Sequence, residues 1–172
     1  MTDLRQAATV ARQYIGEHEK PQNSGFMSST FEVKMKSVGW DRGQAWCAYF
    51  TELVWKEAFP DYFQLLDELF SASAVNNWKI FSNHRDFICD REFRIGCLCI
   101  WQMYMNGKPH WTGHMGIGSS LIVPENFLSI EGNTNSYGGR EGVEVAERNR
   151  SLNFEPKEHG LVLLGFVKIK GL

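Results

Sequence analysis

The fold is decided by residues 40–50, whose sequence is Trp40-Asp41-Arg42-Gly43-Gln44-Ala45-Trp46-Cys47-Ala48-Tyr49-Phe50. A glycine-bearing turn leads here into an apolar pattern with helical spacing, which predicts a helix from about Ala45 to Ala58, before Pro60. Cys47 would lie in the first turn of that helix. Helix N-termini carry unpaired N–H groups and a partial positive charge, and both favour the thiolate, the nucleophilic form of cysteine. Taken alone, the stretch is also compatible with a packed cysteine.

Helical spacing of apolar residues recurs on both sides of this stretch within the first ninety residues, with a polar loop at residues 17–25. Gly16 is the expected stop of the first helix, and Ser73 is the expected cap of the last. Besides the helix that carries Cys47, the predicted helices cover residues 3–16, 28–39, 65–70 and 74–81.

After residue 90 the pattern changes to short β-rich segments that are separated by Gly, Pro or Asn clusters. Helices followed by strands are typical of an α+β domain with an antiparallel sheet. The predicted strands cover residues 93–104, 113–122, 127–131, 142–147 and 161–169.

The composition is that of one ordinary globular domain over residues 1–172, with 43% hydrophobic and 22% charged residues. A formal charge of −2 without a long Lys/Arg run disfavours a nucleic-acid partner. No apolar run reaches the roughly 18 residues that a membrane span needs, so no membrane insertion is predicted. The first residues lack the apolar core of a signal peptide, and synthesis in the cytoplasm is expected.

The four cysteines are Cys47, Cys89, Cys97 and Cys99. They form no Cys-x-x-Cys pair, so reduced thiols are expected, although a bridge from Cys89 to Cys97 or Cys99 stays open for a protein outside the cytosol. Cys97 and Cys99 with His110 and His114 are a conceivable zinc set. Their spacing is unlike that of a zinc knuckle and both cysteines lie in an apolar strand, so packing is favoured and no metal is predicted.

Attack of a cysteine on an amide needs a base, a group that orients the base, and donors for the oxyanion. His114 lies in Gly113-His114-Met115-Gly116, where glycine neighbours let another chain or a substrate approach closely. Glu131 and Asn133 end a later strand, and its period-two geometry places them on one face. Either of them could orient the imidazole of His114 and leave its other nitrogen for Cys47.

The motifs in this order resemble the CHAP family, the cysteine, histidine-dependent amidohydrolases/peptidases, which are papain-like cell-wall hydrolases of bacteria and phages. The runs that carry the resemblance are Gly43-Gln44-Ala45-Trp46-Cys47-Ala48-Tyr49-Phe50, Gly113-His114-Met115-Gly116-Ile117 and Ile130-Glu131-Gly132-Asn133-Thr134. Weaker similarity covers Tyr14-Ile15-Gly16-Glu17-His18-Glu19 with Asn23, Gly142-Val143-Glu144-Val145 with Arg148, and Gly165-Phe166-Val167. Gly96-Cys97 stands where many members carry Gly-Asp, so a calcium site or contact that depends on that acid is unsupported.

The resemblance implies a papain-like α+β fold, with N-terminal helices packed on a C-terminal antiparallel sheet. It makes Cys47 the nucleophile, His114 the base and later the general acid, and Glu131 the group that orients His114. Asn133 matches a further site position. In the implied mechanism, the backbone N–H of Cys47 and the side chain of Gln44 stabilise the oxyanion.

The implied substrate is an amide bond of peptidoglycan, cleaved as an amidase or an endopeptidase, without a cofactor. A monomer is expected, acting at the cell wall after release or specialised export. Trp40, Trp46, Trp111 and Tyr137 flank the candidate residues in the sequence, and we expect them to line a groove for a glycan or peptide stem. Two alternatives are a catalytically weak cell-wall-binding or regulatory module of the same fold, and a zinc-binding domain or zinc hydrolase.

Overall fold

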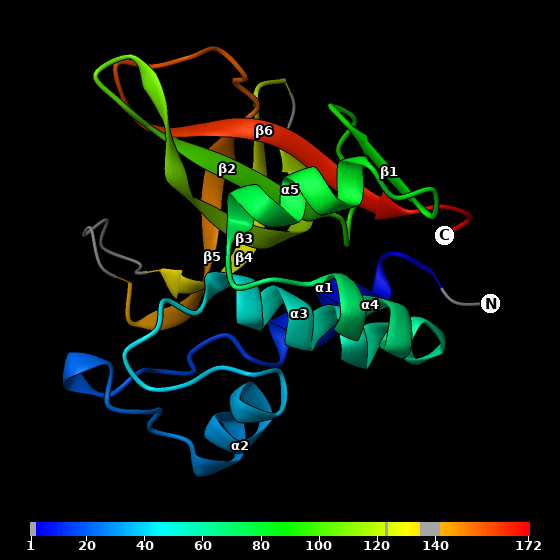
Figure 1. Cartoon of the computed structure of the whole chain (residues 1–172). Helices are drawn as coiled ribbons and strands as arrows, with labels where there is room; N and C mark the ends of the chain where they lie inside the picture. The colour runs from blue at the N-terminus through cyan, green and yellow to red at the C-terminus, as the bar shows by residue number, and fades with distance from the viewer. Residues whose placement is uncertain (1–2, 123, 135–141) are drawn as a thin grey trace.

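The computed structural model describes residues 3–122, 124–134 and 142–172, and it confirms the α+β class. Six strands form one antiparallel sheet in the order β1-β6-β2-β3-β4-β5 (Figure 1). Their bounds are β1 Phe87–Asp90, β2 Leu98–Met105, β3 Lys108–Ile122, β4 Asn126–Thr134, β5 Glu144–Ser151 and β6 His159–Ile169.

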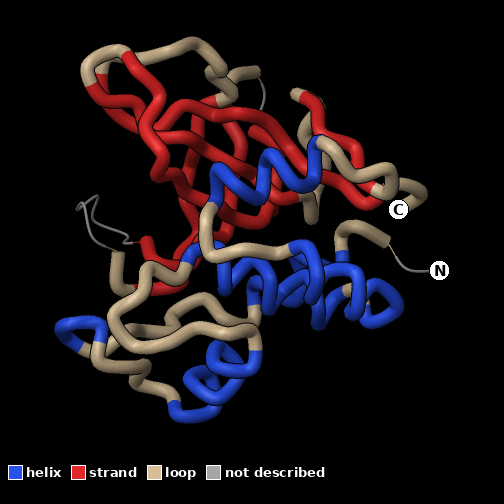
Figure 2. The backbone as a smooth tube through the Cα atoms, in the orientation of Figure 1, coloured by secondary structure: helices blue, strands red, loops and turns tan. Residues whose placement is uncertain are grey.

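The helices precede the strands in the chain, as the sequence predicts. Their bounds are α1 Gln6–Arg12, η1 Pro21–Asn23, α2 Ser29–Ser37, α3 Cys47–Ala58, η2 Pro60–Tyr62, α4 Phe63–Leu69 and α5 Ala74–Ser82. Figure 2 shows that most helices gather below the strands, whereas α5 lies against them. None of the helices in the described part of the chain has the length and apolar character that a membrane span requires.

Several boundaries differ from the predicted ones. The first helix ends at Arg12 and continues as turns to Gly16, whose φ of +95° stops it. The short strand β1 was not predicted, because four residues give too little periodicity. The chain from 91 to 97 is not strand, since Gly96 adopts a φ of +91° and turns the backbone into β2. β3 begins at Lys108, five residues earlier than predicted.

Helix α3 packs against α1 and against strands β3 and β4, which places its first turn beside the middle of the sheet. This packing requires a glycine at position 132. A Cβ atom there would lie 2.6 Å from the ring of Trp46 and 2.7 Å from the Cβ of Phe50, closer than carbon atoms can approach. Gly132 therefore lets β4 approach the start of α3 and brings its neighbour Glu131 to the same region.

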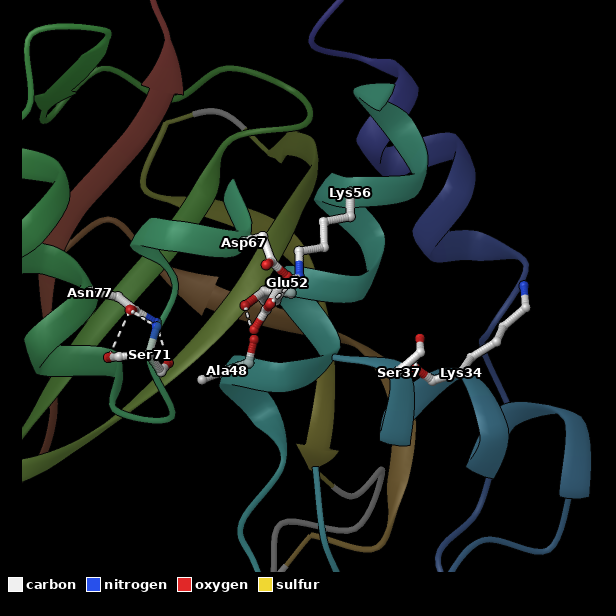
Figure 3. Close-up of polar contacts among 9 residues, drawn as sticks. Lys34, Ser37, Ala48, Glu52, Lys56, Asp67, Ser71 and Asn77 are labelled. Atoms are coloured by element: carbon white, nitrogen blue, oxygen red, sulfur yellow. Dashed lines mark hydrogen bonds and ion pairs between the residues drawn. The ribbon is translucent and has the colours of Figure 1, made fainter. Parts of the chain in front are cut away.

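An ion cluster, in which Lys56 and Glu52 are buried and Asp67 is exposed, fastens the far half of α3 to α4. Lys56 is 4% exposed, and its Nζ lies 2.5 Å from Glu52 Oε1 and 2.6 Å from Asp67 Oδ1 (Figure 3). A buried ammonium is tolerated only when it is paired in this way. The cluster therefore fixes the direction of the helix whose other end carries Cys47.

Candidate active site

Cys47 is the first residue of α3, as the sequence predicts, and Trp46 is the N-cap. Among the described residues, no side chain caps this helix start, so no side-chain cap occupies its first N–H groups. The thiol is only 7% exposed. Backbone N–H groups of Ala48 and Met115 donate to its sulfur. The positive end of the helix dipole and these donors all stabilise a negative charge on the sulfur.

The turn before Cys47 is held by two buried tryptophans. The indole N–H of Trp46 donates to Glu19 Oε2 at 3.0 Å, and that of Trp40 donates to the backbone oxygen of Gln44 at 3.0 Å. Trp40 is 2% exposed and Trp46 is fully buried, so neither presents a surface to a substrate. This corrects the expectation that they line a groove: the aromatic core around Phe26 holds both rings.

Gln44 is exposed, and its side-chain oxygen accepts a hydrogen bond from the backbone N–H of Asp41 at 3.2 Å. That bond closes the turn and leaves the amide nitrogen as the end that could donate to an oxyanion. A role of Gln44 in catalysis stays a prediction.

His114 lies on β3, and its Nε2 is 2.8 Å from Oε2 of Glu131 on the neighbouring strand β4. The other face of the imidazole is covered by Trp101, whose ring centre is 5.9 Å away. Because Glu131 occupies Nε2, Nδ1 is the nitrogen left for Cys47, with which His114 forms a hydrogen bond. The structure therefore brings Cys47, His114 and Glu131 together from a helix and two adjacent strands.

The glycines around His114 allow this assembly. A Cβ at Gly116 would lie 2.6 Å from Cγ of Glu131, and a Cβ at Gly113 would lie 2.2 Å from the backbone oxygen of Trp101. The prediction that glycines beside His114 allow a close approach is confirmed at both positions, where the neighbouring strands β2 and β4 approach β3.

Glu131 is completely buried and surrounded by donors. Arg150 on β5 donates through Nε to Oε1 at 2.7 Å and through Nη2 to Oε2 at 2.5 Å. The hydroxyl of Ser129 also donates to Oε1. With His114, these groups satisfy both carboxylate oxygens, which a buried carboxylate requires.

Asn133 does not share this geometry. Its φ of +54° breaks the alternation of the strand, and the pairing of β4 with β5 is irregular between Glu131 and Thr134. The same-face prediction for Glu131 and Asn133 depended on regular extended backbone, so its premise fails here. Of the two candidates, Glu131 is the one that contacts His114.

The pKa values of the three groups move in mutually supporting directions. Burial alone raises the pKa of Cys47, but the charge of His114 and its hydrogen bond hold that pKa below the ordinary value. Burial alone lowers the pKa of His114, yet the negative charges of Glu131 and Cys47 raise it to about 9. Burial raises the pKa of Glu131, whereas Arg150 and His114 lower it to about 2. A thiolate beside an imidazolium is the form that these surroundings favour.

Hydrogen bonds at the start of α5 connect this helix to strand β3 beside His114. Ser73 caps this helix by accepting from the N–H of Asn76, as predicted. Asn77 is fully buried, holds Ser71 through several hydrogen bonds (Figure 3) and donates to the sulfur of Met115 at 3.2 Å. This network ties the start of α5 to the residue that follows His114.

A groove of about 410 Å³ lies between α5 and the β2–β3 hairpin; it reaches Trp111, three residues before His114 on β3, but Cys47, His114 and Glu131 do not line it. Trp111 is 75% exposed there, so it is the one expected groove tryptophan that is available to a substrate. Tyr137 lies outside the described residues. A hollow of about 520 Å³ near the two chain ends contains none of the candidate residues. The groove is lined by Ser73, Val75, Asn76, Lys79, Gln102, Pro109, His110 and Trp111.

The conceivable zinc set is not assembled. Cys97 and Cys99 are buried with their sulfurs 3.9 Å apart, His110 bonds to Thr112, and His114 faces Glu131. In residues 3–122, 124–134 and 142–172, no three His, Cys, Asp or Glu side chains gather as metal ligands would. All four cysteines are free thiols in the structure.

Sequence reasoning missed two residues of this site, Arg150 and Ser129. Ser129 is two residues before Glu131 and therefore on its face, which was the available signal. For Arg150 no local signal exists, because its partner lies nineteen residues away on another strand.

Comparisons with protein-family models, with curated proteins and with solved structures gave no match.

Proposed function

We propose that this protein is a cysteine hydrolase that cleaves amide bonds of peptidoglycan. The observation that carries the chemistry is the hydrogen-bonded series Cys47, His114 and Glu131 at the start of α3, with the pKa values of the thiol and the imidazole shifted toward each other. An activated thiol, a base and a group that orients the base are the parts that nucleophilic amide cleavage requires.

In the proposed mechanism, the thiolate of Cys47 attacks the amide carbonyl carbon. The tetrahedral oxyanion receives hydrogen bonds from N–H groups at the start of α3, the backbone N–H of Cys47 among them. His114 then gives its proton to the leaving amine, and the C–N bond breaks to leave a thioester. Water, deprotonated by His114, attacks the thioester carbon and releases the carboxylic acid and the thiolate. Glu131 keeps the imidazole oriented throughout, through Nε2.

The papain-like arrangement and the peptidoglycan substrate are supported by the order of the three motifs and by their resemblance to the CHAP family. The groove at Trp111, three residues before His114 on β3, supports an extended substrate, because Trp111 offers a large aromatic face to a sugar or a peptide stem. Action at the cell wall follows from this substrate.

Mass analysis of purified peptidoglycan after digestion tests the function. The wild-type protein should release new fragments, and a new amine on either the stem or the cross-bridge would identify the cleaved bond. Peptidoglycans with several stem-peptide chemistries should be compared, so that a narrow substrate specificity is detected. Intact fragments from all of them would favour the alternative of a catalytically weak wall-binding module, which a sedimentation assay with insoluble peptidoglycan would detect.

The pH profile of kcat/KM should have an alkaline limb at an unusually high pH. The reactive pair needs His114 protonated, and because Glu131 and Cys47 raise its pKa to about 9, we expect kcat/KM to fall as the pH rises through about 9. The free energy of unfolding should depend on pH in the same direction. The contribution of His114 is complete below its unfolded pKa, about 6.5, and is lost as the pH rises through about 9. Glu131 adds stability above its unfolded value that is lost as the pH falls through about 2. A rate profile with an alkaline limb near 6.5 would contradict the pairing.

A further inference from the structure

Arg150 joins the candidate site from the outermost strand on its side of the sheet. It pairs across β4 with Phe127, and its long side chain extends along that strand to reach Glu131 with two hydrogen bonds, at 2.7 and 2.5 Å. Its guanidinium also lies 5.2 Å from the ring centre of Trp101, the same ring that covers His114. Trp101 is thus in contact with both cations that flank the buried carboxylate.

The charges of this group balance only when Arg150 is counted. The thiolate of Cys47 and the carboxylate of Glu131 are negative, and His114 and Arg150 are positive. Among the described residues, Cys99 on β2 also interacts with Glu131 and Arg150; it is fully buried, and burial raises its pKa so that it stays neutral. Without the guanidinium, the fully ionised group would carry one uncompensated negative charge away from water, which is costly.

We propose that Arg150 is a positioning residue that keeps Glu131 ionised and fixed in plane, and thereby sets the pH range in which the Cys47 thiolate exists. The inference rests on the proposed catalytic role of Cys47 and His114, and it deepens that role. When the guanidinium is removed, the uncompensated negative charge favours binding of a proton, either to Glu131 or to the Cys47 thiolate. In the first case His114 loses the anion that raises its pKa, and in the second the nucleophile itself is neutralised. Both outcomes reduce the thiolate fraction at neutral pH.

The geometry also explains why arginine is present rather than lysine. Two parallel N–H groups meet the two oxygens of one carboxylate, which fixes the carboxylate plane, and the flat guanidinium stacks on Trp101. A lysine ammonium would supply the charge without fixing the plane. Arg150→Lys should therefore preserve the pH range of the thiolate while it lowers the rate, and the two contributions can be separated.

The test is a titration of the Cys47 thiolate by its ultraviolet absorbance, taken as the difference between each protein and the same protein carrying Cys47→Ser. We compare wild type, Arg150→Gln, Arg150→Lys and a control, Arg85→Gln, whose side chain is 91% exposed. In Arg150→Gln the titration midpoint should rise by about 1 pH unit or more. The midpoint should move by less than half of that in Arg150→Lys, and it should stay at the wild-type value in Arg85→Gln.

The readout needs no substrate, so the outcomes separate the two proposals. A wild-type midpoint at the value of an ordinary thiol would contradict the thiolate pair itself. A lowered wild-type midpoint that is unchanged in Arg150→Gln would overturn the role of Arg150, because a purely structural arginine would lower the melting temperature without moving the titration. If Arg150→Gln does not fold, Arg150→Lys provides the test. A titration midpoint raised by as much as 1 pH unit in Arg150→Lys would show that the positive charge at position 150 does not set the midpoint of the Cys47 thiolate.

Discussion

Substitution of Cys47 by serine should lower peptidoglycan hydrolysis by roughly 10⁴- to 10⁶-fold, the scale on which loss of a nucleophile acts in hydrolases. The hydroxyl has nearly the same size as the thiol, so the fold around α3 should persist. It is a much weaker acid, however, and the dipole of α3 with the charge of His114 cannot ionise it at neutral pH. The loss should appear in kcat, with binding to insoluble peptidoglycan retained.

Cys89→Ser is the matched control for this substitution. Cys89 is a half-buried free thiol on β1, away from the site, and burial raises its pKa above the ordinary value. The same chemical change there should leave the rate within about twofold of wild type, because nothing in the proposed mechanism involves it. Equal fragment patterns from wild type and Cys47→Ser would refute the assignment of the nucleophile.

Substitution of Glu131 by glutamine should damage both catalysis and folding. The amide keeps the shape of the side chain but loses the negative charge that His114 and Arg150 share, at a position with no exposure. His114 loses the anion that raises its pKa, and its tautomer is no longer fixed, which in a serine protease triad costs about 10⁴-fold in kcat. Arg150 becomes a largely buried, poorly compensated cation, and breaking such a pair costs about 3–5 kcal/mol of stability.

Two measurements check this expectation. Urea unfolding gives the loss of stability, and an imidazole titration by NMR gives the pKa of His114, which should fall from about 9 toward its ordinary value. Glu147→Gln is the control, since Glu147 is an exposed carboxylate that accepts one hydrogen bond from Ser119. A Glu131→Gln protein with wild-type activity and an unchanged His114 pKa would show that the carboxylate does not orient the base.

Cys47 and His114, to which we assign the chemistry, could be placed from the sequence because each has a local signature. A turn with Gly43 before an apolar helix places Cys47 at a helix start, and glycines beside His114 indicate close packing of strands. Both features depend on neighbours within a few residues, and the structure contains both. The Ser73 cap of α5 is of the same kind.

The parts that could not be predicted depend on contacts between distant strands or on backbone geometry. Glu131 and Asn133 were equivalent candidates under ideal strand geometry, and only the positive φ at Asn133 separates them. Trp40 and Trp46 adjoin the nucleophile in sequence, but the buried Glu19 and the aromatic core hold the indole of Trp46 inside. Proximity in sequence to the proposed nucleophile does not determine which way a large side chain points.

We predict that the thiol of Cys47 is ionised near neutral pH because His114 is protonated beside it. Alkylation of the four cysteines by iodoacetamide, mapped by mass spectrometry across a pH series, measures this directly and needs no substrate. We expect Cys47 to react first, at a rate that is already high below pH 7 and that collapses in His114→Gln. If Cys47 reacts only as the pH approaches about 8.5, the pKa of an ordinary thiol, and its reaction rate is unaffected by His114→Gln, Cys47 and His114 do not form a thiolate–imidazolium pair.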